Sequence, residues 1–464
     1  ESLDGSKKFD LANGTLSVDF YEDILEPCIS MKVSAMFSFN IVSELPIRGG
    51  ERVVLDFTLP SGEFKMDSEK TMYVYKVGEL KSDKQSVTFN LYLSSKEHFI
   101  NEISRCPRKF ENVPISTHVE TILKEDLFTE KECDIEETRG EYSFYGNTRK
   151  PFYILQWLAP KAVPVISNKS GTSGGDGTKN GESNGTSGYF FYENQDGFNF
   201  RSIEGLVSRT RENTDSADAK THGEEIHGPY IHQGKGSIGN VYKVEENFKI
   251  NHVHVNRGTD IRKALAVGQY ANTTVFFDSV SQVVSVYDYK LLGDDGLENQ
   301  LGGDDEKEES SNELKMLNSR LFVRVSDHGT LGIGTDGFQT SGIDQAYQAK
   351  SASRYNQLFS QSVDIQIPLN TNIKVGDIIN CIFPKLDSYS GQPKDDDPSA
   401  SGNYLVARLN HHIQPNASFS SLNLVRDSYG YLNITPSNNQ SAETEPTYES
   451  NRKKQRRLRA NQFK

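Results

Sequence analysis

The sequence has few cysteines, and they follow no metal-binding or disulfide pattern. Cys28, Cys106, Cys133 and Cys381 are scattered over 464 residues, with no CxxC spacing among them. This low density argues against a disulfide scaffold, and the missing spacing argues against a cysteine-based zinc site. We therefore expect reduced structural cysteines, in keeping with assembly in a cytosol.

Long hydrophobic runs and common catalytic motifs are also missing. No run of about 18 apolar residues occurs, and the first residues, "ESLDGSKKFDL", lack the apolar region of a signal peptide. We expect a soluble chain that is not exported and does not insert into a membrane. No GxSxG nucleophile motif is present, although the abundant carboxylates leave a glycosidase pair open.

Acidic residues outnumber basic ones, 64 Asp and Glu against 51 Lys and Arg, but basic residues gather at the C-terminus. The net charge of −13 opposes non-specific binding to nucleic acid or to an anionic membrane surface. The final segment, "NRKKQRRLRANQFK", nevertheless holds a basic cluster: Arg452, Lys453, Lys454, Arg456, Arg457 and Arg459. It could be a solvated tail, a docking arm for an acidic partner surface or a DNA contact. We expect the weakly apolar residues 431–464 to form an extended arm.

Two patterns resemble ligand-binding motifs without meeting their structural requirements. "GKGSIG" (234–239) matches GxGxxG, but the following "NVYKVEENFKINHVHV" indicates a strand instead of the required helix. We expect a linker there. Histidines recur at His222, His227 and His232 and in the pairs His252/His254 and His411/His412. We expect the first three to be solvated and the pairs to lie on strand surfaces, and we predict no metal, cofactor or catalytic residue.

The remaining sequence favours a multidomain, mainly β protein. Tyr and Phe are abundant, and aromatic or Val/Thr-containing segments alternate with short connections marked by Gly. Four polar runs interrupt these segments: 168–188, 212–223, the acidic 293–313, and 390–402. Runs of Gly, Ser and like charge do not pack, so we predict that these are surface loops.

Two segments far apart in the chain repeat one pattern. "GGERVVLDFTLP" (49–60) precedes "YVYKVGELKSDKQSVTFNLYL" (73–93), and "VGDIINCIFP" (375–384) precedes "YLVARLNHHIQPNASFSSLNL" (404–424). Placing Tyr73 on Tyr404 without a gap puts Leu91 on Leu422 and Leu93 on Leu424. Each copy is typical of a strand ended by Pro and followed by a hairpin with alternating inward residues. We predict a duplicated β domain; a chance likeness of generic strands is the alternative.

Helical and hairpin signals fill the region between the copies. "PISTHVETILKEDL" places Val119, Ile122 and Leu123 on one helix face, and Pro151 suits the first turn of "PFYILQWLAPKA". Further helices are expected near 259–271 and 342–361. "GYFFYENQDGFNFRSIEGL" (188–206) is typical of a hairpin with its turn at "NQDG".

The order of five segments resembles the central baseplate hub protein of contractile-tailed bacteriophages, which is similar to the hub part of type VI secretion spike proteins. These segments are "LPIRGGERVVLDFTLP", "HFINEISRCPRKFENVPISTHVETILKEDL", "EYSFYGNTRKPFYILQWLAPKAVP", "GYFFYENQDGFNFRSIEGL" and "YLVARLNHHIQPNASFSSLNLVRDSYG". The resemblance implies a mainly β fold with α/β insertions and two tail-tube-like antiparallel β-barrel domains per chain.

The resemblance also implies domain boundaries. Residues 1–105 would form the first barrel, and 106–235 an α/β domain with a disordered Gly/Ser-rich loop at 166–188. The second barrel would combine 236–292 and 355–430, separated by an acidic loop and α/β insertion at 293–354. Residues 431–464 would form the basic tail.

As to function, the resemblance implies a non-enzymatic structural hub in the baseplate of a virion tail, assembled in the host cytoplasm. Three chains would form a ring that joins a three-fold central spike to the six-fold tail tube. This homotrimer would start tube assembly and surround the DNA channel. Its partners would be the spike, tail tube, wedge and tape-measure proteins, with transient passage of phage DNA. The alternative is a glycan-binding or glycan-degrading tail protein.

Overall fold

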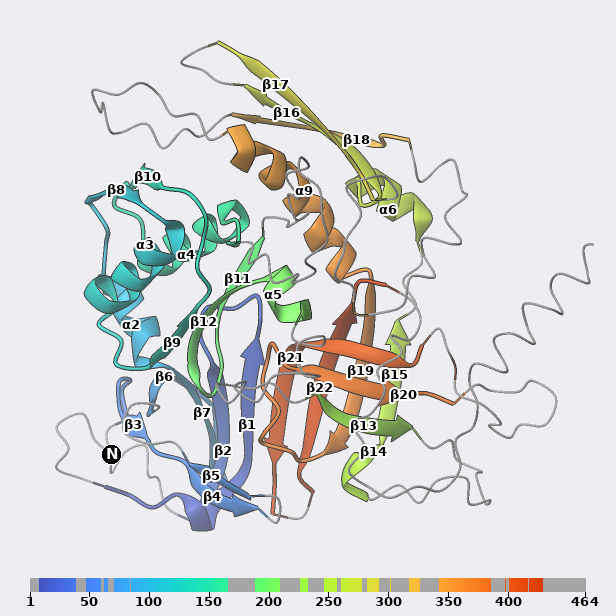
Figure 1. The fold of residues 1–464 in the computed structure, drawn as a ribbon. Coiled ribbons are helices and arrows are strands. Elements are labelled where there is room, and N and C mark those ends of the chain that lie inside the picture. Colours follow the sequence, from blue (N-terminus) through green and yellow to red (C-terminus); the bar gives the residue numbers. More distant parts are fainter. Residues whose placement is uncertain are drawn as a thin grey trace, which may run out of the picture. The chain divides into compact units, whose positions relative to one another are not determined.

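A computed structural model shows a mostly β chain (Figure 1). It describes residues 8–38, 47–59, 62–65, 71–83, 85–165, 188–208, 226–232, 246–256, 260–277, 282–291, 301, 317–325, 342–384, 397, 400–415 and 417–428. The chain divides into two compact units, Glu1–Leu432 and Asn433–Lys464. The second unit lies outside the described residues, and so does the basic cluster at 452–459.

Twelve strands form one large sheet. Their bounds are β1 Thr15–Asp23, β2 Ser30–Phe37, β3 Arg52–Val53, β6 Met72–Ser82, β7 Val87–Ser94, β13 His227–His232, β14 Lys249–Ile250, β15 His252–Asn256, β19 Gln361–Pro368, β20 Ile378–Ile382, β21 Gly402–Ile413 and β22 Phe419–Arg426. A separate hairpin pairs β4 (Asp56–Leu59) with β5 (Gly62–Lys65).

The large sheet contains the same strand order twice. Repeat 1 runs β1-β2-β7-β6-β3, and repeat 2 runs β15-β19-β22-β21-β20, with every neighbouring pair antiparallel. The repeats meet where β1 pairs with β21, from Val18 opposite Ile413 to Asp23 opposite Arg408. Closure of either repeat into a barrel stays a prediction.

Equivalent backbone contacts set the residue correspondence between the repeats. Gly50 donates its N–H to Val74 O, and Gly376 donates to Val406 O; the two glycines have φ of +91° and +93°. Val74 therefore corresponds to Val406. The match of Tyr73 with Tyr404 predicted Leu405 at this position, so β6 and β21 begin one residue out of the expected alignment. A bulge between Gly78 and Lys81 adds one residue to β6 and restores the expected register.

The second hairpin arms match as predicted. Leu93 lies opposite Val74 and Leu424 opposite Val406, so Leu93 and Leu424 correspond. The inward residues of both arms are buried: Val87, Phe89, Leu91 and Leu93 in β7, and Leu422 and Leu424 in β22. This alternation buries one face of each arm, so a slip of one residue would expose the whole apolar set.

The region between the repeats contains the predicted helices and hairpin. Its elements are α2 Lys96–Ile103, β8 Lys109–Val113, α3 Ile115–Thr121, the π-helical turn η2 Ile122–Asp126, β9 Glu132–Ile135, β10 Tyr142–Tyr145, α4 Pro151–Leu158, β11 Tyr189–Glu193, β12 Gly197–Ser202 and α5 Ile203–Ser208. Val119, Ile122 and Leu123 are fully buried, and Pro151 occupies the first turn of α4. β11 and β12 pair as expected, and β9 adds to β12 in parallel.

A third region is inserted between β15 and β19. α6 (Ile261–Val267) precedes a sheet of order β17-β16-β18, and α9 (Gly342–Leu358) leads into β19. These strands are β16 Ala271–Phe277, β17 Val284–Lys290 and β18 Arg320–Val325. Of the segment 236–292 assigned to the second barrel, β14 and β15 pair in the large sheet, whereas β16 and β17 pair with β18. The domain boundaries stay predictions.

Candidate functional site

The turn of the β11–β12 hairpin, Glu193–Gly197, contacts both repeats. Asn194 Nδ2 donates to Val375 O in repeat 2 at 3.5 Å, and Lys374 Nζ donates to Asp196 Oδ2 at 2.5 Å. On the repeat 1 side, Glu193 Oε2 accepts from Ile29 N at 3.1 Å. We call Glu193–Gly197 the junction turn, because it ties the intervening region to both halves of the large sheet.

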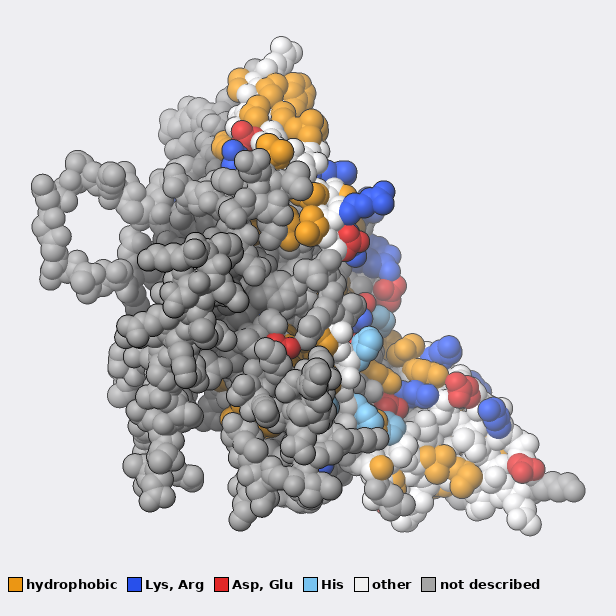
Figure 2. Space-filling view, turned by 90° about the vertical axis from the view of Figure 1, so that its right-hand side faces the viewer, with side chains coloured by type: hydrophobic (Ala, Val, Ile, Leu, Met, Phe, Trp, Pro, Cys, Tyr) orange, Lys and Arg blue, Asp and Glu red, His pale blue; other side chains and the backbone are white. Residues whose placement is uncertain are grey.

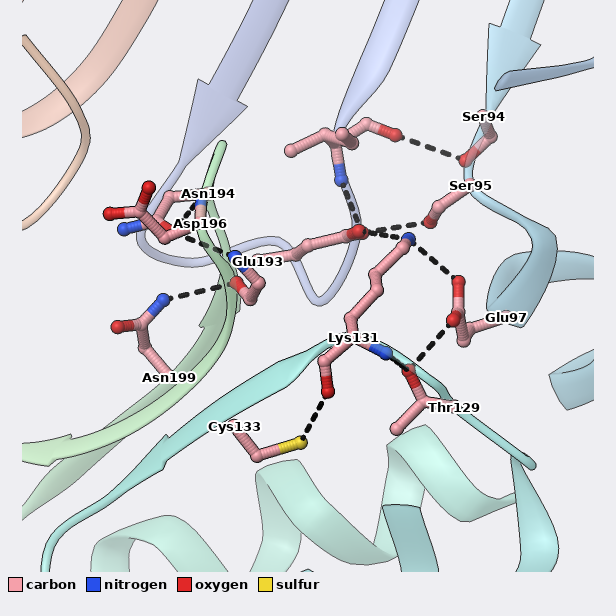
Figure 3. A network of polar contacts seen from close by, with 12 residues as sticks. Ser94, Ser95, Glu97, Thr129, Lys131, Cys133, Glu193, Asn194, Asp196 and Asn199 are labelled. Atoms are coloured by element: carbon pink, nitrogen blue, oxygen red, sulfur yellow. Dashed lines mark hydrogen bonds and ion pairs between the residues drawn. The ribbon is translucent and has the colours of Figure 1, made fainter. Parts of the chain in front are cut away.

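A buried ionic cluster holds the repeat 1 side of this junction (Figure 3). Lys131 Nζ lies 2.8 Å from Glu97 Oε2 and 2.5 Å from Glu193 Oε1, and the three side chains are no more than 4% exposed. Ser95 Oγ donates to Glu193 Oε2, and Thr129 Oγ1 donates to Glu97 Oε1, both at 2.8 Å. The cluster joins the residue before β9, α2 and the junction turn through charge-assisted bonds in a dry environment.

The protonation of the cluster follows from its burial and its charges. Burial lowers the pKa of Lys131, but the attraction of Glu193 and Glu97 outweighs it, so the pKa lies above its ordinary value. Lys131 is therefore held as a cation. Burial raises the pKa of Glu193, and the nearby Glu97 adds to this effect against the opposing pull of Lys131. Glu97 and Glu193 thus share one ammonium group, and loss of that group would leave buried charge uncompensated.

The β1–β21 joint between the repeats carries its own polar contacts. Glu22 Oε2 accepts from Val375 N at 2.9 Å, and Asp23 Oδ2 pairs with Arg408 Nε at 2.8 Å. His412 Nδ1 contacts Asp19 Oδ1 at 2.5 Å across the same strand pair. These contacts add to the six opposed residue pairs of β1 and β21 and fix the repeats in one register.

Two buried groups at this joint have strongly shifted pKa values. Burial raises the pKa of Glu22 to about 8, against the opposing hydrogen bond from Val375. Burial lowers the pKa of His411 to about 4. His411 Nδ1 lies 2.8 Å from Ser420 Oγ, and its ring stacks on Phe20. Both groups are thus neutral at pH 7, which suits a strand pair buried inside a continuous sheet.

A second ionic cluster anchors the inserted region. Arg354 of α9 donates from Nε to Glu204 Oε1 at 3.0 Å and from Nη1 to Asp427 Oδ2 at 2.6 Å. The Arg354 and Asp427 side chains are fully buried. Asp427 Oδ1 also accepts from Leu301 N at 2.9 Å. The acidic segment 293–313, expected to be a solvated loop, therefore includes a buried residue, because Leu301 is 0% exposed.

The histidines lie in strands and not in a common site. His227 and His232 are half-buried in β13, where His227 Nε2 lies 3.1 Å from Asp377 Oδ2, so the expectation that they are solvated is wrong. The pair on β15, at 252 and 254, lies exposed as expected. In the pair on β21, His411 is buried instead of lying on a strand surface. His222 and the 234–239 motif lie outside the described residues.

The buried charges of the described residues form joints between segments. Within the described part of the chain, no group of three His, Cys, Asp or Glu side chains could hold a metal ion. Among the same residues, no helix has the length and apolarity needed to cross a membrane. The buried charges join segments distant in sequence, so their evident role is to fix the parts of the chain relative to one another.

Sequence reasoning missed these charged joints. Lys131 lies in the charged run "TEKECD" and Glu193 follows the strand "YFFY", so each looks like an ordinary surface residue. The one signal for Glu193 is its place between an aromatic strand and a turn. Pairing of Lys131 with Glu193 depends on the parallel addition of β9 to β12, which local patterns do not reveal.

Comparison with known proteins gives a curated relative and several structural neighbours. The "Probable baseplate hub protein gp334" of Vibrio phage KVP40 is 22% identical over 336 residues, which cover 71% of this chain and 70% of that protein. No protein-family model matches the chain.

Among solved structures, the tail protein from Neisseria meningitidis MC58 matches 92% of this chain and 97% of its own at a TM-score of 0.49 and 11% identity. The 43 kDa tail protein of prophage MuSo2 from Shewanella oneidensis covers 89% and 94%, with a TM-score of 0.45 and 9% identity. The curated relative confirms the resemblance of this chain to the baseplate hub proteins of bacteriophages.

Proposed function

We propose that the chain is the structural hub of a phage baseplate, built as a trimeric ring. The curated relative supports the general role of a hub or tail protein. The observation that carries the ring is the doubled strand order of the large sheet. Three chains with two equivalent repeats each present six similar units around one axis. Such a ring can meet a three-fold spike on one face and a six-fold tube on the other.

The β1–β21 joint indicates how neighbouring chains would meet. β21 pairs with β20 along its first residues and with β1 along its last ones. Its counterpart β6 pairs with β3 only at Met72 and Tyr73, so the edge from Lys76 to Ser82 carries no strand among the described residues. β15, the counterpart of β1, likewise pairs with β19 alone in the described part. We therefore propose that β6 of one chain pairs with β15 of the next chain, in the same way that β21 pairs with β1 within one chain.

This correspondence fixes a register for the contact between chains. Phe20 lies opposite His411 and Asp19 opposite His412 in the internal joint. The matching positions are Val255 opposite Leu80 and His254 opposite Lys81. Leu80 is 53% exposed, and a strand added to this edge would cover it. Pairing also removes an open sheet edge, which otherwise invites aggregation.

A cysteine pair tests this ring. Cβ atoms of opposed residues in an antiparallel pair lie about 4.5–5.5 Å apart, close to disulfide range. Oxidation of a His254→Cys, Lys81→Cys variant should therefore link chains, and the native mass by light scattering should be that of a trimer. The control pair is His254→Cys with Lys76→Cys. Lys76 corresponds to Arg408, so after the bulge is taken into account the two cysteines are displaced by roughly 13 Å along the strand and should not link. A monomer without links would overturn the ring.

The partners follow from the ring. We propose that the trimer binds the central spike and tail tube proteins, contacts wedge and tape-measure proteins, starts tube assembly and surrounds the path of the DNA in the virion tail. The chain's net charge of −13 would keep phosphate from adhering to a channel wall. The basic residues at 452–459 would dock on an acidic partner surface. Mixing the purified chain with the spike and tube proteins should raise its mass, whereas a constant mass would count against these partners.

We propose that the chain is not an enzyme. The curated relative is named for a structural part, which supports this view. The glycan-binding alternative requires a cleft with paired carboxylates or aromatic platforms. Trp157, the one tryptophan, does not offer a free platform on one face, because Lys161 Nζ lies 3.3 Å from its ring centroid. Incubation with cell-wall glycan should leave the glycan intact and unbound.

A further inference from the structure

Tyr75 occupies a position at which the two repeats differ. β6 and β21 each have a bulge directly after the matched valines, which makes Tyr75 the counterpart of Ala407. Ala407 is 2% exposed, whereas Tyr75 is 47% exposed. The same point of the same strand is therefore covered in repeat 2 and open in repeat 1, where it also carries a much larger side chain.

The internal joint shows what covers the position in repeat 2. Ile24, the first residue after β1, donates its N–H to Ala407 O at 2.9 Å and is 1% exposed. Both residues belong to the same hydrophobic cluster. Among the described residues, no N–H from outside the strands takes this place at Tyr75 O. Tyr75 lies between the part of β6 that pairs with β3 and the open edge that begins at Lys76.

Other aromatic side chains hold the Tyr75 ring in place. Its centroid lies 6.2 Å from that of Tyr92 on β7 and 6.3 Å from that of His98 on α2. Leu80 on β6 and Val54 directly after β3 extend the apolar surface and are 53% and 57% exposed. A large ring that is already fixed within its own chain loses little side-chain entropy on binding and buries much area, so such tyrosines are typical anchors of interfaces.

We propose that Tyr75 anchors the contact between neighbouring chains and is covered by the first turn of α6 of the next chain. This inference rests on the proposed ring, in which β15 takes the place of β1. The position that matches Ile24 is then 259, which lies outside the described residues, and α6 begins two residues later. Ile261, at this start of α6, is 44% exposed and offers an apolar side chain to the tyrosine ring.

β15 and α6 are presented together on one side of the molecule. β15 ends at Asn256 and α6 begins at Ile261, and Figure 1 places both on the same side. Figure 2 shows that side, with histidine side chains at the height of β15 and Lys and Arg side chains above them at the height of α6. Exposed side chains of the two elements include His252, His254, Arg262 and Lys263. A neighbouring β6 paired with β15 therefore brings Tyr75 to the end of β15 from which α6 follows.

The first test is the dissociation of the full chain in a dilution series, followed by sedimentation velocity. The wild type should dissociate from trimer to monomer, and Tyr75→Ala should raise the concentration of half-dissociation by about tenfold or more, as loss of an interface anchor does. Tyr75→Phe keeps the ring and should behave like the wild type. Tyr145→Ala removes a tyrosine of similar exposure, 46%, on β10 and is the matched control, which should leave dissociation unchanged.

The second test identifies what covers Tyr75 and does not depend on the stability of the alanine variant. Replacement of Tyr75 by p-benzoylphenylalanine allows photo-crosslinking, and the linked peptide is identified by mass spectrometry. The link should join position 75 to residues 257–267. In a mixture of ¹⁵N-labelled and unlabelled chains, it should also join labelled to unlabelled peptides, because the two partners belong to different chains. The same replacement at Tyr145 should give no such link.

The outcomes separate this inference from the ring. A wild-type trimer that dissociates no more easily in Tyr75→Ala, or a link from position 75 to another part of the chain, overturns the inference while the ring stands. The disulfide of the His254→Cys, Lys81→Cys variant reports the ring without involving Tyr75. A monomeric wild type without that disulfide overturns the ring and this inference together.

Discussion

Single buried charges determine how firmly the intervening region is held. Lys131 is shared between Glu97 and Glu193 with almost no solvent access. Desolvating three charges is costly, and it is offset here by short ionic contacts and by hydroxyl donors on both carboxylates. Such a cluster contributes less to net stability than to specificity, but removing one member leaves the others uncompensated.

We expect Lys131→Met to lower the free energy of unfolding by about 3–5 kcal/mol, because it leaves two buried carboxylates without a cation. Urea unfolding at pH 7 measures this change. Lys124→Met, which removes an exposed partner of Glu120, is the control and should change little. Equal effects of the two substitutions would show that the buried cluster is not holding the junction.

Glu22 should make stability fall as the pH rises. Its pKa is about 8 in the folded chain and 4.5 as a free side chain, so between these values the folded state keeps a proton that the unfolded state has lost. His411, with a pKa lowered from 6.5 to about 4, gives the opposite slope below pH 6.5. The free energy of unfolding should therefore fall between pH 6.5 and pH 8, by about 2 kcal/mol.

Glu22→Gln should remove this loss, since an amide does not titrate. Urea unfolding at pH 6.5 and pH 8 compares the wild type, Glu22→Gln and the exposed neighbour variant Glu26→Gln. The Glu26 variant should keep the slope of the wild type. A slope that persists in Glu22→Gln would assign the pH dependence to another group.

At the scale of elements, the sequence predicted those helices and turns that depend only on residues close together along the chain. The hairpin at 188–206 and the helices around Val119 and Pro151 follow from turn residues and periodicity, and all are present. The bulge between Gly78 and Lys81 was missed because it depends on strand pairing. The burial of His411 and Glu22 was missed for the same reason: β1 meets β21 across almost the whole chain.

The glycine turns that start β3 and β20 are equivalent elements with different surroundings. Gly376 corresponds to Gly50, and Gly49 beside it serves as the comparison in repeat 1. Gly49 and Gly376 have φ of +113° and +93°, so alanine at either position costs roughly 1–3 kcal/mol of backbone strain. A Cβ at Gly376 would also lie 2.2 Å from Tyr192 Oη, whereas the nearest atom at Gly49 is 3.7 Å away. We expect Gly376→Ala to lower the urea midpoint clearly more than Gly49→Ala. Equal losses would mean that Tyr192 moves aside freely.

At the scale of the whole molecule, the sequence indicated duplication from a short echo with few identities. The strand order shows a deeper correspondence, since five strands repeat in order and direction. What the sequence left out is that the repeats share one sheet through β1 and β21. Local patterns define each strand, but they do not determine which distant strand lies beside it.

The shared sheet and the charged joints predict that residues 1–432 unfold as one unit. Trp157, the one tryptophan, lies in α4 of the intervening region, whereas circular dichroism mainly follows the strands of the two repeats. In urea, fluorescence and circular dichroism should change at the same midpoint in the wild type. In Lys131→Met, the joint between the intervening region and repeat 1 is weakened. The midpoint measured by fluorescence should then lie at a lower urea concentration than the midpoint measured by circular dichroism. Separate midpoints already in the wild type would contradict a single cooperative unit, and coincident midpoints in the variant would show that the β1–β21 joint and the Arg354 cluster suffice to keep it together.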